Sequence, residues 1–129
     1  MSAVVRMNGD VSIVELSGEF TLGGGNVARP LDLHGHRLQD LGQTLGGLLY
    51  RGSTRLVLDL DKVRFMDSAG LGELVAWKKR ALQVGGDVRL LRPRDRVRDL
   101  FELMALTRVF QIFENEADAV ASFRPAGRP

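Results

Sequence analysis

Ser68 lies in a setting that suits it to accept a phosphoryl group. It belongs to the run Asp67-Ser68-Ala69-Gly70-Leu71-Gly72, which follows a hydrophobic segment typical of a buried strand and precedes apolar residues at helical spacing. The hydroxyl is therefore predicted at a helix N-terminus, where free backbone N–H groups and the helix dipole accommodate an anion. The two glycines leave little side-chain bulk, so another protein's backbone or a nucleotide could approach closely. A phosphoryl group on Ser68 would change the local charge and could act as a switch.

The same residues allow other interpretations. Ser68 could be a simple helix N-cap, a role worth about 1 kcal/mol. It could be a catalytic nucleophile, but no Gly-x-Ser-x-Gly sequence surrounds it, and only His34 and His36 are available as histidine bases. Asp67 could be a general base for phosphoryl transfer, or a helix-start residue that interacts favourably with the dipole, and we favour the second role.

An ordered series of segments resembles one known family. The run from Asp67 to Gly72, with Glu73-Leu74-Val75 after it, is similar to the signature of the STAS family, the sulfate transporter and anti-sigma factor antagonist domain. Further matching segments lie at residues 16–23, 85–91, 107–113 and 116–123. The stretch 24–52 matches least and looks longer than the family norm. Phe20-Thr21 stand where the family usually has an acidic residue, so the chain departs from the family pattern at that position.

The resemblance implies an anti-sigma factor antagonist, which is a protein-binding switch and not an enzyme. In such families the dephosphorylated form binds an anti-sigma factor, often a serine-protein kinase, and phosphorylation of the matching serine ends that binding. The implied phosphorylation site is Ser68, and the implied partners are the anti-sigma factor or serine-protein kinase and a phosphatase acting on phospho-Ser68. No catalytic residue, metal or cofactor is expected. Two alternatives stay open: a scaffold subunit of a larger signalling assembly, and an accessory subunit of a membrane transport complex.

The expected partner-binding surface centres on the signature loop. It comprises Met66, Asp67, Ser68, Ala69, Gly70, Leu71, Gly72, Trp77 and Gly24. Trp77 lies off the stripe formed by Leu71, Leu74, Val75 and Leu82, so it could be an exposed interface anchor or could be partly buried under a neighbouring helix. Gly23-Gly24-Gly25 lacks the Gly-Lys-Ser/Thr of a phosphate-binding P-loop and is better explained as a flexible turn.

The hydropathy pattern predicts an α/β fold in a single domain over residues 1–123, with a flexible tail at 124–129, and the resemblance implies that this fold is of the STAS type. We expect a mixed β-sheet of about five strands, an N-terminal hairpin followed by parallel crossovers, and about four helices. Asn8-Gly9 marks the hairpin, Gly85 the end of the helix that begins at Ser68, and Asn115 the N-cap of a final helix through Phe123. Other predicted elements are a helix at 36–50, strands at 56–60, 88–91 and 109–113, and an amphipathic stripe of Val97, Leu100, Phe101 and Met104.

Composition narrows the function further. The 129 residues are 44% hydrophobic and 26% charged, which is globular, and the absence of cysteine excludes disulfides and thiolate chemistry within the chain. Arginines at 89–98 alternate with acidic residues and lack interleaved aromatics, so nucleic-acid binding is not expected. Asp32, His34 and His36 could ligate a metal but lack a clear fourth ligand. With no membrane-length apolar run and no signal pattern, we expect a cytoplasmic monomer or weak dimer without membrane insertion.

Overall fold

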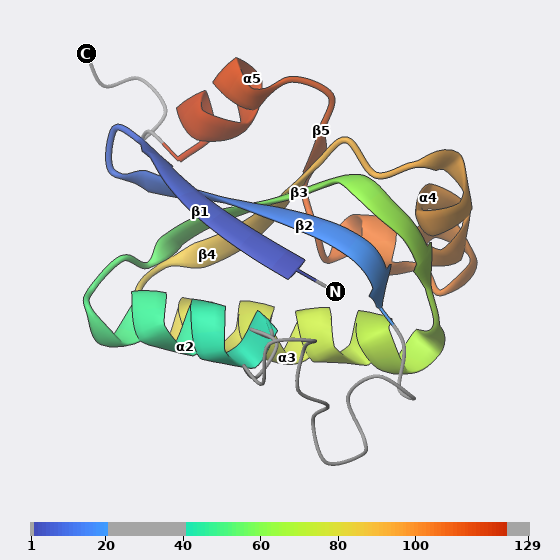
Figure 1. Cartoon of the computed structure of the whole chain (residues 1–129), viewed down its shortest axis with the longest axis horizontal. Helices are drawn as coiled ribbons and strands as arrows, with labels where there is room; N and C mark the ends of the chain where they lie inside the picture. Colours follow the sequence, from blue (N-terminus) through green and yellow to red (C-terminus); the bar gives the residue numbers. More distant parts are fainter. Residues whose placement is uncertain (1, 21–40, 124–129) are drawn as a thin grey trace, which may run out of the picture.

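The chain forms a five-stranded sheet with helices on both faces (Figure 1). The computed structural model describes residues 2–20 and 41–123. The strands are β1 (Ser2–Asn8), β2 (Val11–Phe20), β3 (Arg55–Met66), β4 (Asp87–Leu91) and β5 (Ile112–Phe113). The helices are α2 (Leu41–Tyr50), α3 (Ser68–Gln83), α4 (Asp95–Leu103) and α5 (Glu116–Ala121), with a short 3₁₀ turn, η1 (Leu106–Arg108).

The sheet order follows the sequence, β1-β2-β3-β4-β5. Strands β1 and β2 pair antiparallel, and the three other neighbouring pairs are parallel. The predicted mixed sheet and hairpin are therefore confirmed. Asn8 pairs with Val11, so Gly9 and Asp10 form the turn, and Gly9 adopts a φ of 64° that a residue with a side chain rarely tolerates.

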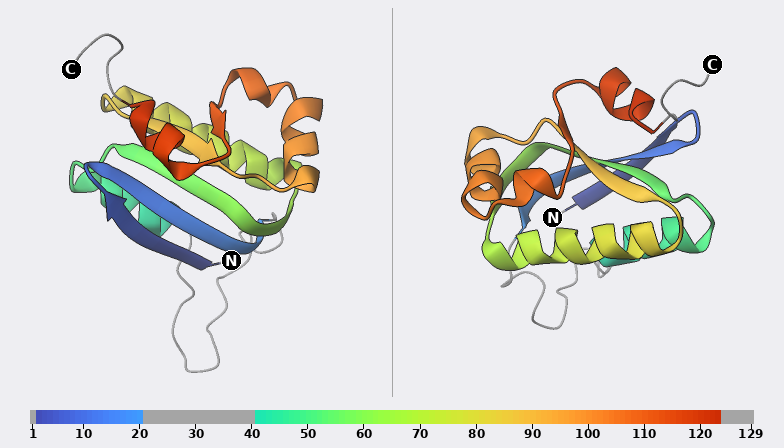
Figure 2. Two further views of the ribbon diagram at one scale, coloured as in Figure 1. Left: turned by 90° about the horizontal axis from the view of Figure 1, so that it is seen from above. Right: turned by 180° about the vertical axis from the view of Figure 1, so that it is seen from behind.

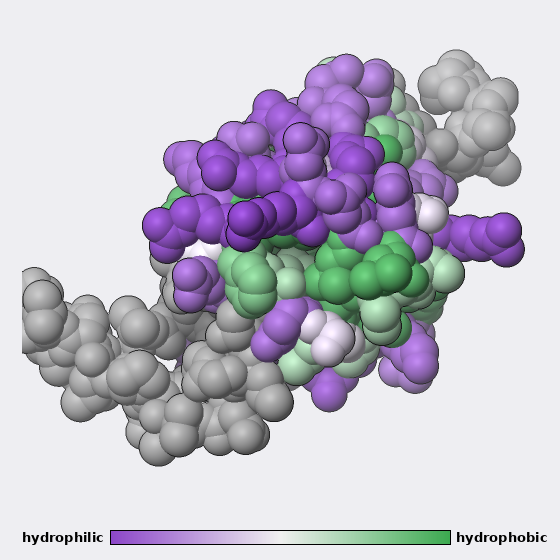
Figure 3. Space-filling model, turned by 90° about the vertical axis from the view of Figure 1, so that its right-hand side faces the viewer, coloured by the Kyte–Doolittle hydropathy of each residue, from purple (hydrophilic) through white to green (hydrophobic). Residues whose placement is uncertain are grey.

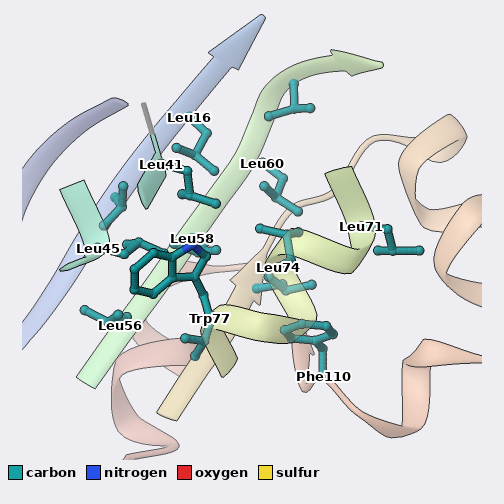
Figure 4. Close-up of a cluster of buried hydrophobic side chains, with 14 of the residues drawn as sticks. Leu16, Leu41, Leu45, Leu56, Leu58, Leu60, Leu71, Leu74, Trp77 and Phe110 are labelled. Atoms are coloured by element: carbon teal, nitrogen blue, oxygen red, sulfur yellow. The ribbon is translucent and has the colours of Figure 1, made fainter. Parts of the chain in front are cut away.

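The larger core lies between the sheet and helices α2, α3 and α4. Leucines on α2 and α3 pack against leucines of the central strands, and Figure 4 shows them converging around Trp77 and Leu74. The α2 stripe of Leu41, Leu45 and Leu48 is buried, as its spacing predicts. Figure 2 shows α3 crossing behind the sheet, and Ser68 is the first residue of this helix.

Helix α3 is fixed firmly at its C-terminal end. Gly85 adopts a φ of +84°, and its N–H bonds to the Leu82 carbonyl while the N–H of Gly86 bonds to the Ala81 carbonyl. This is the Schellman pattern expected for a glycine at C′. A Cβ on Gly86 would lie 1.9 Å from the Thr54 carbonyl oxygen, so only glycine allows this approach to the start of β3.

Helix α5 packs on the opposite face of the sheet, and an ion pair links it to β1. Ala119 of α5 packs with Val11, Ile13, Val57 and Leu91, and Asn115 caps the helix by accepting a bond from the Asp118 N–H at 2.8 Å. The predicted N-cap is thus confirmed.

Arg6 of β1 ties the hairpin to α5. Its guanidinium forms an ion pair with Glu116, and the Asn8 amide donates to the same carboxylate at 2.8 Å. The bond from Arg6 is the largest cause that lowers the pKa of Glu116 from its ordinary 4.5 to about 2.

Four predicted boundaries were wrong. Strand β3 was predicted over residues 56–60 but continues to Met66, because Val63 and Met66 are also buried. Strand β5 holds only residues 112 and 113, because Phe110 turns into the main core while Val109 is exposed. Met104 is also exposed, since α4 ends at Leu103 and a left-handed Ala105 follows. Helix α5 ends at Ala121, before Phe123. The predictions for residues 21–40, which include Gly24, and for the tail at 124–129 lie outside the described residues.

Candidate functional site

Asp67 is the N-cap of helix α3. Its backbone is extended, with φ −100° and ψ 177°, and its Oδ1 accepts a hydrogen bond from the Gly70 N–H at 2.8 Å. Its carbonyl accepts the first helical bond, from the Leu71 N–H at 3.0 Å. The favoured helix-start role of Asp67 is confirmed, and the interpretation of Ser68 as the cap is wrong because Ser68 is already the first helical residue.

Ser68 is exposed and its hydroxyl is unengaged. Within the part of the chain that the structure describes, that hydroxyl makes no hydrogen bond. Ser68 stands in the first helical turn, whose N–H groups precede the intrahelical ladder and carry the positive end of the dipole. The hydroxyl is therefore accessible to a reagent, and a negative charge placed on it lies in a favourable field of the helix.

The exposed face beside Ser68 is made of small residues. Ser68, Gly72 and Ala76 are spaced four apart and all exposed, and Ala69 is exposed beside them. A Cβ on Gly72 would meet nothing within 4 Å, and Gly72 lies in the helix without a positive φ. The fold therefore does not require glycine at position 72, although glycine costs a helix about 0.5–1 kcal/mol relative to alanine. What Gly72 provides is a flat surface that another molecule can approach closely.

The remaining residues of the signature are buried or half-buried and lie beneath this exposed surface. Met66, Gly70 and Leu71 are buried, while Asp67 is half-buried. These residues hold the loop in place, and the exposed members of the predicted surface in the signature are Ser68, Ala69 and Gly72.

Trp77 is a core residue, so the idea of an exposed anchor is wrong. Only 8% of its surface is exposed. Its ring packs on α2, where a Cβ on Gly46 would lie 3.4 Å from Cη2, and the Arg80 guanidinium covers the ring at 4.6 Å from its centroid. The buried stripe of α3 runs through Gly70, Leu71, Leu74, Trp77 and Ala81. Gly70 and Ala81 on this stripe are small, so the hydropathy pattern did not show where the stripe runs. Leu82, which the sequence analysis placed on the stripe, is 52% exposed.

A groove that the sequence did not reveal opens next to Asp67. It has a volume of about 450 Å³ and lies between the end of β3 and one face of α4. Its lining consists of Phe65, Met66, Asp67, Arg96, Asp99, Leu100 and Leu103. Figure 3 shows hydrophobic surface gathered on this side of the molecule below a hydrophilic area. Residues 65–67 and 96–103 are distant in sequence, so only the tertiary fold brings them together.

Two further features concern ligands and membranes. Among residues 2–20 and 41–123, no three His, Cys, Asp or Glu side chains are grouped so that they could hold a metal ion. The candidate metal ligands Asp32, His34 and His36 lie outside these ranges. A search of the described helices finds none with the length and apolar character needed to span a membrane.

Comparison with known proteins agrees with this geometry. The model of the STAS domain matches residues 2–119. The chain belongs to the STAS domain family. BtrV of Bordetella bronchiseptica, provisionally named an anti-sigma factor antagonist, is 30% identical over 88 residues, which are 68% of this chain and 76% of BtrV.

Solved structures share the fold of this STAS domain. An anti-sigma factor antagonist from Mycobacterium paratuberculosis has a TM-score of 0.75 at 23% identity, covering 96% of this chain and 94% of that one. The Bacillus cell fate determinant SpoIIAA in its phosphorylated form has a TM-score of 0.65 at 18% identity, covering 95% of this chain and all of that one. At these identities the likeness shows the fold alone.

Proposed function

We propose that this STAS domain is an anti-sigma factor antagonist whose binding to an anti-sigma factor is ended by phosphorylation of Ser68. The observation that carries the proposal is the exposed hydroxyl of Ser68 at the start of α3, which makes no hydrogen bond with the described residues and lies beside the flat surface of Ala69 and Gly72. The names of the relatives support the partner class. The partner would be an anti-sigma factor, often a serine-protein kinase, and a phosphatase would restore the binding form.

The physical basis of the switch is the charge of the phosphate. Phosphorylation adds about −1.5 to −2 charge units at neutral pH. On Ser68 these charges would lie next to the Asp67 carboxylate, and Glu73 follows five residues later in the same helix. A partner that packs closely on Gly72 would have to strip water from the phosphate, and that cost with the repulsion exceeds the favourable dipole term of roughly 0.3–1 kcal/mol. The unmodified hydroxyl imposes no comparable penalty.

The chain would supply only the acceptor in the phosphoryl transfer. Nucleotide, metal and most of the catalysis would come from the kinase, so the domain needs no catalytic residue, metal or cofactor of its own. It would act in the cytoplasm as a monomer or weak dimer. We expect Ser68 to be the sole main site of modification when the domain is incubated with its kinase and ATP. Peptide mapping that places the phosphate on Thr21, Ser53 or Ser122, with Ser68 unmodified, would contradict this.

Charge variants test the switch directly. Ser68→Ala should keep both the fold and the binding of the anti-sigma factor, whereas Ser68→Asp should keep the fold and weaken binding. Ser53→Asp is the matched control, because Ser53 lies in the loop before β3, at the opposite end of that strand from Ser68. Affinity would be measured by calorimetric titration with the purified anti-sigma factor. Equal affinities for Ser68→Ala and Ser68→Asp would refute a charge-controlled interface.

The two alternative roles predict different behaviour. A scaffold subunit should run as a large, stable particle in size-exclusion chromatography, and a transport subunit should co-purify with an ATPase. The proposed switch should do neither.

A further inference from the structure

The groove between β3 and α4 begins next to the exposed surface formed by Ser68, Ala69 and Gly72. Asp67, which caps the helix that carries Ser68, is also part of the groove lining. A partner that covers Ser68 therefore meets the mouth of this groove at the neighbouring residue. The groove and the Ser68 surface are continuous through this one loop.

The groove walls are apolar and open to solvent. Leu103 is 80% exposed and Phe65 is 44% exposed, and Leu100 is half-buried between them and the core. Next to Leu103, Met104 is 47% exposed. Phe65 and Leu103, with the accessible part of Leu100, form the kind of apolar surface that marks a protein-interaction site. Phe65 and Leu103 in particular are left largely uncovered by the described residues.

The two charged side chains that α4 contributes to the groove have no charged or hydrogen-bonding partner among the described residues. Arg96 and Asp99 are exposed, and neither forms an ion pair or a side-chain hydrogen bond with any residue in the ranges 2–20 and 41–123. The neighbouring Arg98 and Arg94, by contrast, are engaged by Glu114 and by the Asp61 carbonyl. One positive and one negative charge, one helical turn apart, are therefore available to an external partner.

We propose that this groove binds an amphipathic helix of the anti-sigma factor, alongside the contact at Ser68. The inference rests on the proposed function and adds a second anchoring point to it. Residues 96, 99, 100 and 103 form one face of α4 and offer side chains rather than free backbone groups, which favours a helix in a groove over an added strand.

The dimensions of the groove define its occupant. From Arg96 to Leu103 α4 rises about 10 Å, so roughly two turns of a partner helix would fit along it. That helix would place two or three apolar residues against Phe65, Leu100 and Leu103. It would carry an acidic residue opposite Arg96 and a basic residue opposite Asp99.

A pair of leucine variants tests the groove. Leu103→Glu places a charge in the groove, and Leu82→Glu makes the same change at an exposed leucine on α3, about 21 Å along the helix from Ser68. The probe is a purified anti-sigma factor of the source organism that binds the wild-type domain. We expect affinity to fall at least about tenfold for Leu103→Glu and to stay within about twofold for Leu82→Glu. Thermal melts would check that both variants remain folded.

Two further measurements identify the occupant. Arg96→Glu should weaken binding, and a charge-reversing substitution of an acidic residue in the partner should restore it. Benzoylphenylalanine in place of Leu103 should crosslink to residues three and four apart in the partner, as on one face of a helix.

The possible outcomes separate the two proposals. If Ser68→Asp abolishes binding while Leu103→Glu binds like wild type, the groove proposal is wrong and the switch stands. Crosslinks to a partner strand or loop would overturn the helix as occupant. If the wild-type domain binds no anti-sigma factor of the organism, the proposed function fails and the groove proposal fails with it.

Discussion

The helix cap and the proposed phosphate acceptor are two neighbouring residues, Asp67 and Ser68, and this division predicts a clear difference in stability. Asp67→Ala removes the acceptor of the 2.8 Å bond from the Gly70 N–H, so the free energy of unfolding should fall by at least about 1 kcal/mol. Ser68→Ala removes a hydroxyl that makes no hydrogen bond among the described residues, and alanine is the better helix former. Its effect should stay within about 0.5 kcal/mol.

For a domain of this size, 1 kcal/mol corresponds to roughly 4 °C in Tm. Differential scanning calorimetry should therefore show a loss of about 4 °C for Asp67→Ala and less than about 2 °C for Ser68→Ala. Asp67→Asn is the control, because asparagine caps a helix about as well as aspartate and should recover most of the loss. If Ser68→Ala unfolds at a lower temperature than Asp67→Ala, the assignment of the cap is wrong.

Other predictions concern the stability of the core, the exposed surface at Gly72 and the loss of stability at low pH. Trp77→Ala should destabilise the domain by roughly 3–5 kcal/mol in urea unfolding, as expected for a buried ring. Gly72→Ala should stabilise it by about 0.5–1 kcal/mol in the same assay, since its Cβ meets nothing, whereas Gly72→Leu should weaken binding of the anti-sigma factor. Because the pKa of Glu116 is about 2 when folded and 4.5 ordinarily, its ion pair with Arg6 stabilises the fold above pH 4.5. That contribution should disappear as the pH falls from 4.5 to 2, and Arg6→Ala should flatten this part of the stability profile.

Local sequence signals predicted the parts of the fold that are determined locally. The hairpin at Asn8-Gly9, the end of α3 at Gly85 and the cap at Asn115 each depend on the conformational preference of one or two residues. The boundary of β5 depends instead on Phe110, whose ring turns into the main core and contacts Phe101 at a centroid distance of 5.8 Å. A tertiary contact of this kind leaves no signal in a window of neighbouring residues.

The same distinction explains which parts of the site were predicted. Ser68, Ala69 and Gly72 are exposed as expected, because a strand end followed by a helix start determines their positions. The sequence analysis left Trp77 off the buried stripe of α3. It did so because Gly70 and Ala81, which belong to that stripe, are too small to stand out in a hydropathy pattern. The groove was missed because its two walls, at residues 65–67 and 96–103, are joined only by the packing of α4 beside β3.

The position of the cap has a consequence for how such a switch can work. If the serine were itself the N-cap, phosphorylation would alter the bond that holds the first turn, and signalling would be coupled to local unfolding. Here Asp67 holds the turn, and the Ser68 hydroxyl points to solvent beside a surface that the fold does not need. A charge on Ser68 can then change the affinity for a partner while the helix, its cap and the core beneath it stay as they are. Asp67 would contribute twice, because it stabilises the helix in both states and adds to the repulsion in the phosphorylated one.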